Sequence, residues 1–102
     1  ILGPSGQNIY PEEIEQVVNN IPYVVESLVI EDNGKLIALI FPDYDAAKHD
    51  GMDEESLAKF LKAKVLEANS SLPSYSKVAD VRLRNEEFEK TPKRSIKRFL
   101  YQ

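Results

Sequence analysis

The tripeptide Asp32-Asn33-Gly34 constrains the fold of this chain more than any other feature, because it separates two runs of β-branched and aliphatic residues. Asn-Gly is the favoured pair for a two-residue hairpin turn, in which both central residues need positive φ. We therefore expect antiparallel strands over residues 24–31 and 35–41. The second run is apolar at every position from Leu36 to Phe41. A strand of this kind is buried on both faces, so it should be central in its sheet.

The segment before the hairpin predicts a short helix over residues 11–20. Pro11 suits the first helical position, and an apolar stripe of helical spacing runs from Ile14 to Ile21. Three glutamates at the start of this segment have the spacing of charges that stabilise a helix N-terminus: Glu12, Glu13 and Glu15.

The segment after the hairpin completes the predicted domain. Residues 43–51 are polar and predict a loop with a helical turn, and Asp53 can cap a long helix. Residues 78–84 alternate as a half-buried strand with Ala79, Val81 and Leu83 inward. The order predicts an α+β fold, with a small antiparallel sheet (the hairpin plus a third strand) packed with helices. A chain of 102 residues has room for one such domain.

The C-terminal end is basic and the rest of the chain is acidic. Residues 89–102 carry five cations and one acid, whereas residues 1–88 carry 8 basic and 16 acidic side chains. A basic tail of this kind favours contact with something anionic, such as phosphate groups or a negative surface. The acidic body would repel a nucleic-acid backbone, so we expect no nucleic-acid partner. Residues 96–101 also resemble a short amphipathic segment, which leaves open a weak peripheral membrane contact.

Disulfides and thiolate metal sites are excluded, because the chain has no cysteine. This composition suits a reducing cytoplasm. His49 is the only histidine and lies in a polar stretch, where we expect it to be solvated. We expect no metal site in this chain.

Two segments resemble the small C-terminal domain of adenylate-forming (AMP-binding) enzymes, the superfamily of acyl-CoA synthetases, luciferases and peptide-synthetase adenylation domains. Ser5-Gly6-Gln7-Asn8-Ile9-Tyr10-Pro11-Glu12-Glu13-Ile14-Glu15 is similar to the loop and helix that open that domain. Lys90-Thr91-Pro92 through Ile96-Lys97-Arg98 is similar to its terminal K-T-x-x-G-K-I-x-R segment. The resemblance covers essentially the whole chain and is strongest to bacterial long-chain fatty acid–CoA ligases.

The resemblance implies that residues 1–102 are the mobile C-terminal domain of such a ligase, with the hinge and the large N-terminal adenylation domain outside the sequence. The enzyme would convert a fatty acid and ATP into an acyl-adenylate and pyrophosphate, and then transfer the acyl group to CoA with release of AMP. The N-terminal domain, which would bind Mg²⁺, is the expected partner. We expect residues 1–102 alone to be inactive, and the enzyme to be cytoplasmic, with a possible peripheral contact at the membrane.

The sequence departs from the family pattern at the catalytic lysine of the first step. In ungapped register this lysine position falls on Ser95, and the preceding glycine position falls on Arg94. A compact ammonium group stabilises charge on phosphate oxygens, which serine cannot do. Either Lys93 or Lys97 replaces the missing cation, or the first step is weakened and relies on other groups, or Ser95 is a loss of function. A gapped register would make Lys97 catalytic.

For the second step, the resemblance points to Gly6, Gln7 and Asn8. A residue without Cβ, such as Gly6, lets the backbone approach the narrow pantetheine arm of CoA closely. The tail cations Lys90, Lys93, Arg94 and Arg98 are candidates, by their charge alone, for contacts with CoA or nucleotide phosphates.

Two other interpretations remain. The first is an adenylate-forming relative that uses another carboxylate or another acceptor. The second is a non-catalytic interaction module with a basic tail.

Overall fold

The hairpin predicted around Asn33 is present in the computed structural model, which describes residues 9–101. Strand β1 (Val24–Asp32) pairs antiparallel with strand β2 (Lys35–Pro42). Asn33 and Gly34 join them with φ angles of 52° and 78°. Both angles lie in the left-handed region, which is the condition that selects Asn-Gly for this turn.

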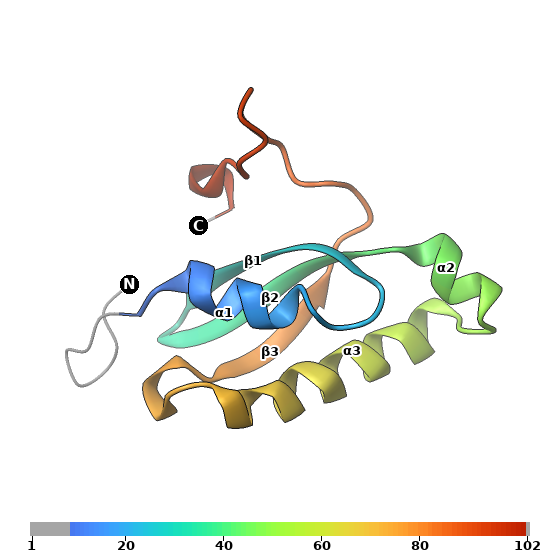
Figure 1. Cartoon of the computed structure of the whole chain (residues 1–102), viewed down its shortest axis with the longest axis horizontal. Helices are drawn as coiled ribbons and strands as arrows, with labels where there is room; N and C mark the ends of the chain where they lie inside the picture. The colour runs from blue at the N-terminus through green and yellow to red at the C-terminus, as the bar shows by residue number, and fades with distance from the viewer. Residues whose placement is uncertain (1–8, 102) are drawn as a thin grey trace.

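The third strand, β3 (Val78–Leu83), lies next to β2 in the order β1-β2-β3 and runs parallel to it. The predicted α+β class is confirmed, but the sheet is mixed and not wholly antiparallel. The physical reason is the connection between β2 and β3, which contains helices α2 (Tyr44–His49) and α3 (Glu54–Ala68) and carries the chain back along the sheet (Figure 1). A crossover of this length allows parallel pairing.

Strand β3 also contains an irregularity that the alternating pattern did not predict. Leu36 pairs with Val78 and Ile37 pairs with Asp80, so Ala79 is an extra residue without a partner in the ladder. Such a bulge changes the face on which the preceding residues lie. Consequently Val78 is buried and Ala79 is exposed, and the prediction that Ala79 points inward is wrong.

The helices begin where the sequence predicts. Helix α1 (Pro11–Val18) starts with proline, and α3 starts after Asp53, whose carboxylate accepts a hydrogen bond from the Ser56 amide at 2.8 Å. Residues 44–49 form a complete short helix and not a loop with a turn, because Asp43 caps them by accepting from the Ala46 amide at 3.0 Å. The remaining helical turns are of the 3-10 type: Asn69–Ser71, Ser74–Ser76 and Arg98–Leu100.

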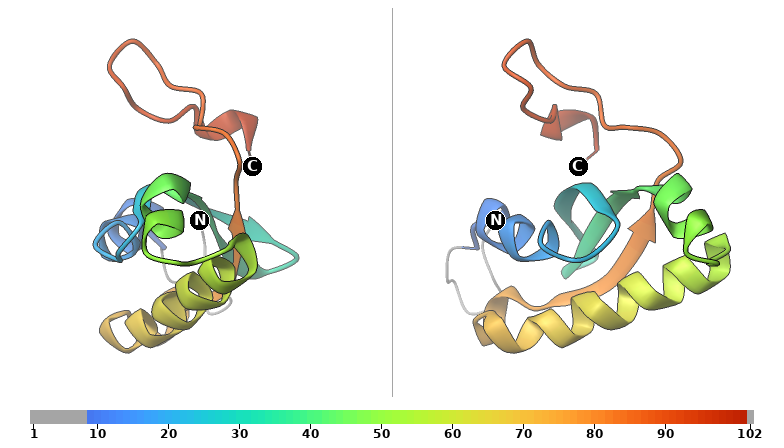
Figure 2. Two further views of the ribbon diagram at one scale, coloured as in Figure 1. Left: turned by 90° about the vertical axis from the view of Figure 1, so that its right-hand side faces the viewer. Right: turned by 45° about the vertical axis from the view of Figure 1, so that its right-hand side comes forward.

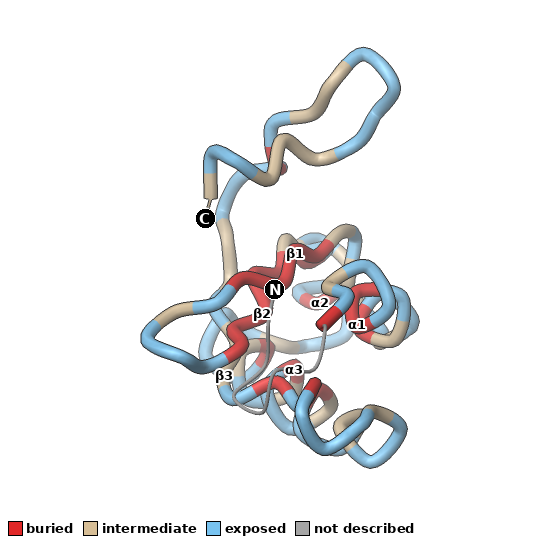
Figure 3. The backbone as a smooth tube through the Cα atoms, turned by 90° about the vertical axis from the view of Figure 1, so that its left-hand side faces the viewer, coloured by how far each residue is buried: buried red, intermediate tan, exposed pale blue. Residues whose placement is uncertain are grey.

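The core lies on both faces of the sheet, as the apolar β2 run predicts. On one face, α1 and α3 pack on Val29, Ala38 and Ile40, which are fully buried. On the other face, Leu28 and Ile37 are buried together with Phe88, which comes from the segment after β3. Figure 3 shows the buried residues gathered on the strands and on parts of the helices.

The contribution of the first face can be measured at Leu61, which is fully buried in α3. Leu61→Ala should lower the free energy of unfolding by about 2–5 kcal/mol, because it removes apolar contacts and leaves a cavity. The matched control is Leu66→Ala in the same helix, where the side chain is 43% exposed; this change should cost less than about 1 kcal/mol. Urea denaturation measures both, and equal losses would contradict the packing described.

Candidate functional site

The C-terminal tail, residues 84–101, folds back on the domain. Figure 2 shows it leaving the end of β3, extending away from the sheet and returning as a loop. Phe88 is 2% exposed and packs edge-to-face on Tyr101, with 5.1 Å between ring centroids. The Arg84 guanidinium lies 4.8 Å from the Phe88 ring and 4.7 Å from the Tyr101 ring. These contacts join the two ends of the tail, and Phe88 and Tyr101 also pack in the cluster that contains Leu28 and Ile37 of the sheet. The tail is therefore docked and not free.

Between these ends the tail forms a short hairpin, whose tip, residues 91–95, we call the tail loop. Lys90 and Ile96 pair as an antiparallel bridge. The Thr91 amide donates to the Ser95 carbonyl at 2.8 Å, and the Arg94 amide donates to the Thr91 carbonyl at 2.8 Å. These hydrogen bonds within the loop give it a defined conformation.

Arg94 has a φ of 66°, in the left-handed region that normally favours glycine. The ungapped register with the adenylate-forming enzymes assigns the family's glycine to this position. The backbone conformation therefore supports that register, in which Ser95 occupies the position of the family's lysine. Ser95 is exposed at the end of the tail loop.

Three of the five tail cations are paired with carboxylates. Lys90 Nζ lies 2.8 Å from Glu26, and Lys97 Nζ lies 3.0 Å from Glu89. Arg98 Nη1 donates to the Glu15 carboxylate at 2.9 Å. Lys93 and Arg94 are exposed in the tail loop, and neither forms an ion pair with any residue between 9 and 101. The uncompensated positive charge of the tail is therefore concentrated at the loop.

Glu15 is the residue of this region that sequence reasoning missed. Its position predicts a helix-start charge, but it is 7% exposed and its carboxylate accepts from the Val29 amide at 2.8 Å. Both terminal nitrogens of Arg98 also donate to this carboxylate, one of them at 2.9 Å. Hydrogen bonding to Glu15 raises the pKa of the Arg98 guanidinium above its ordinary value. The available signal was the position of Glu15 directly beside Ile14 on the apolar stripe.

A hollow of about 600 Å³ lies between the tail loop, α1 and β1. Its lining carries charges of both signs, with three glutamates (Glu12, Glu15 and Glu26) and three cations (Lys90, Arg94 and Arg98). Ser95 lines it too, whereas Lys93 and Lys97 do not. The structure thus brings together Lys90, Ser95 and Arg98 of the predicted site residues.

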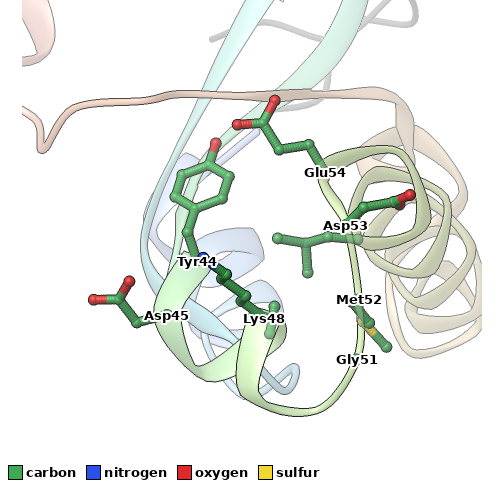
Figure 4. A pocket seen from close by; sticks show the side chains of 9 residues that line it. Tyr44, Asp45, Lys48, Gly51, Met52, Asp53 and Glu54 are labelled. Carbon is green, nitrogen blue, oxygen red and sulfur yellow. The ribbon is translucent and has the colours of Figure 1, made fainter.

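A second hollow, of about 470 Å³, lies between α2 and α3 (Figure 4). Tyr44, Lys48 and Met52 are among its lining residues. None of the predicted site residues that the structure describes lines it. Gly6, Gln7 and Asn8, predicted for the second step, lie outside the described residues.

Within residues 9–101, no group of three or more His, Asp or Glu side chains could hold a metal ion. In the same part of the chain, no helix has the length and apolar character needed to cross a membrane. His49 is exposed at the end of α2.

Residues 1–101 match the family of the AMP-binding enzyme C-terminal domain. The chain belongs to this family. The match confirms the relation to adenylate-forming enzymes that the two terminal segments predicted. No curated protein sequence matches the chain.

Solved structures with the same fold include a domain of a carboxylate reductase, a CoA synthetase and a CoA ligase. An adenylation domain of a carboxylate reductase from Mycobacterium chelonae has a TM-score of 0.81 and 16% identity, over 98% of this chain and 17% of that one. A Mycobacterium tuberculosis fatty acyl CoA synthetase has a TM-score of 0.63 and 24% identity, over 98% of this chain and 18% of that one. A benzoate CoA ligase from Burkholderia xenovorans LB400 has a TM-score of 0.61 and 26% identity, over 88% of this chain and 17% of that one. This chain therefore spans less than a fifth of each.

The left-handed conformation of Arg94 is open to a direct test. Arg94→Gly should stabilise the loop, because glycine adopts a positive φ without the steric cost of a Cβ atom, and should therefore slow hydrogen exchange of the amides at positions 91 and 94. Arg94→Val should destabilise the loop and accelerate exchange of the same amides. Hydrogen exchange followed by NMR measures these amides. The β2 amides serve as an internal control and should not change. If glycine and valine had the same effect, the loop conformation described here would be wrong.

Proposed function

We propose that this chain acts as the C-terminal domain of an ATP-dependent acyl-CoA ligase whose substrate is a long-chain fatty acid. The observation that carries the proposal is the tail loop, with Arg94 in a glycine conformation at the family's glycine position. In the first step, a carboxylate oxygen attacks the α-phosphorus of ATP, a P–O bond forms, and pyrophosphate leaves. In the second, the CoA sulfur attacks the acyl carbon and AMP leaves.

Lys93 is the better candidate for the cation of the first step. Its ammonium group is exposed in the tail loop and has no carboxylate partner among residues 9–101. Lys97 is paired with Glu89 at 3.0 Å, so moving it to a phosphate would require that pair to break. An uncompensated ammonium stabilises charge developing on phosphate oxygens better than a paired one. Ser95, next to Arg94, has no charge and could only donate a hydrogen bond to a phosphate oxygen.

For the second step, we propose that the backbone around Gly6, Gln7 and Asn8 lines the path of the pantetheine arm. Lys90 and Arg98 are less suitable phosphate ligands than the sequence suggested, because each already neutralises a carboxylate of the domain. Lys93 and Arg94 carry the charge that remains for phosphate groups. The ATP and acyl pockets, with any Mg²⁺, would belong to the N-terminal domain, so residues 1–102 alone should be inactive.

A second candidate is an enzyme that delivers its acyl group to another acceptor. It is favoured by the similarity in fold to the carboxylate reductase domain, with a TM-score of 0.81. Comparing CoA with a phosphopantetheinyl carrier protein as the thiol acceptor distinguishes the two. In either case we propose a cytoplasmic enzyme. Phe99, which is 72% exposed, and Leu100 would supply any weak contact with a membrane surface.

The decisive experiment uses the full-length parent enzyme and measures fatty-acid-dependent exchange of pyrophosphate into ATP. Lys93→Ala should lower the exchange rate by roughly 100-fold or more, since one electrostatic contact to the transition state is lost. Lys97→Ala is the matched control and should change the rate by less than about tenfold. Ser95→Lys restores a lysine at the family's position and should raise the exchange rate if Lys93 replaces that lysine only in part.

Three results would contradict parts of this proposal. Loss of exchange in Lys97→Ala but not in Lys93→Ala would assign the cation to Lys97. Unchanged rates in both variants, with a large gain in Ser95→Lys, would mean that the tail has lost its adenylating cation. No exchange in wild type or Ser95→Lys with any carboxylate would reject an adenylating enzyme.

A further inference from the structure

Two poorly exposed carboxylates of the domain body hold the tail on either side of the tail loop. Glu26, on β1, contacts the strand that enters the loop. Its side chain is 12% exposed; one oxygen lies 2.8 Å from Lys90 Nζ, and the other accepts from the Phe88 amide at 2.7 Å. This carboxylate therefore binds both the backbone and a side chain of the incoming strand.

Glu15, on α1, holds the tail after the loop, at Arg98, which begins the 3-10 turn Arg98–Leu100. Its carboxylate accepts from both terminal nitrogens of Arg98 and from the Val29 amide of β1. Arg98 Nε is also 3.7 Å from Glu12, which is 67% exposed. A two-pronged contact between guanidinium and carboxylate fixes orientation as well as distance.

These contacts differ from ordinary surface ion pairs. Exposed pairs contribute little, because water screens both charges. A buried carboxylate is costly unless it is paired, so Glu15 and Glu26 favour the state in which the tail is docked. The aromatic contact of Phe88 with Tyr101 joins the outer ends of the tail, but Lys90 and Arg98 lie closer to the loop and restrict its direction.

We propose that Glu15 and Glu26 are positioning residues that clamp the tail loop to α1 and β1. The resemblance to adenylate-forming enzymes implies that this domain swings between one pose for adenylation and another for thioester formation. The clamped loop would move with the domain as one rigid unit between these poses. This role rests on the proposed function, in which the tail loop contacts ATP in the first step. In the second step the loop has no part, so the clamp should matter little there.

The first test measures loop order and needs no activity. In the 102-residue chain, Glu15→Gln and Glu26→Gln should each accelerate amide hydrogen exchange at Thr91, Arg94 and Lys97 by at least about tenfold through local opening. The matched control is Glu13→Gln, an exposed position of α1 that forms no ion pair with any residue between 9 and 101, and this change should leave these rates unchanged. Amides of α3 report on the rest of the fold and should not change.

Arg98→Lys provides a second variant in case the glutamine substitutions impair folding. It keeps the charge, leaves the α1 core intact and removes the two-pronged contact. It should also accelerate exchange in the tail loop. Wild-type exchange rates in this variant and in the two glutamine variants would overturn the clamp.

The second test separates positioning from general damage in the full-length parent enzyme. Glu15→Gln should lower pyrophosphate exchange by roughly 100-fold, since a small misplacement of a reacting group is costly. Thioester formation from supplied acyl-adenylate and CoA should stay within about twofold, because that step does not use the loop. Equal losses in both steps would show a merely structural role and overturn the positioning proposal.

The two tests fail in different ways. If the wild-type parent catalyses neither half-reaction, the proposed function is rejected and the exchange rates still decide whether the clamp exists. If the wild-type parent is active and Glu15→Gln is active in both steps, the proposed function stands and the positioning role is wrong.

Discussion

The structure depends most on one buried carboxylate, that of Glu15. It joins three segments that are distant in sequence: α1, which carries it, β1, whose Val29 amide donates to it, and the tail, whose Arg98 donates to it. A carboxylate with 7% exposure is stable only when its oxygens receive hydrogen bonds or a charge partner. Docking of the tail is therefore coupled to the packing of α1 on the sheet.

This coupling changes how the basic tail should be understood. As a sequence, it is a run of five cations able to attract any anion. In the fold, Lys90, Lys97 and Arg98 are neutralised by carboxylates, and Lys93 and Arg94 remain exposed in the loop. The positive charge that is not neutralised is therefore confined to the tail loop. Such an arrangement suits a single phosphate-bearing ligand better than an extended polyanion or a broad membrane surface.

The elements that could be predicted from the sequence are those set by local rules. Asn33-Gly34 requires a turn with positive φ, Asp53 caps the helix that follows, and the apolar β2 run is buried on both faces. The parallel direction of β3 and the bulge at Ala79 could not be predicted, because they depend on where a long crossover returns the chain. The two terminal motifs were enough to predict the family, which the match over residues 1–101 shows.

The candidate site was less predictable for a similar reason. Its key contact joins residues 83 positions apart, and nothing local marks Glu15 as different from Glu12 except its place beside the apolar stripe. The tail contacts of Phe88 and Tyr101 with the second face of the sheet are also long-range. By contrast, the positive φ of Arg94 lies at the position to which the ungapped register with adenylate-forming enzymes assigns the family's glycine.

The most direct test of this account is NMR relaxation of the backbone amides of Lys90, Ile96 and Arg98 in the intact chain. The account predicts order parameters near those of β1 and β2, about 0.85, because ion pairs and hydrogen bonds hold these residues to the body. Order parameters below about 0.6 at all three amides would contradict it. The tail would then be a flexible segment, and its cations would be free to find any anion.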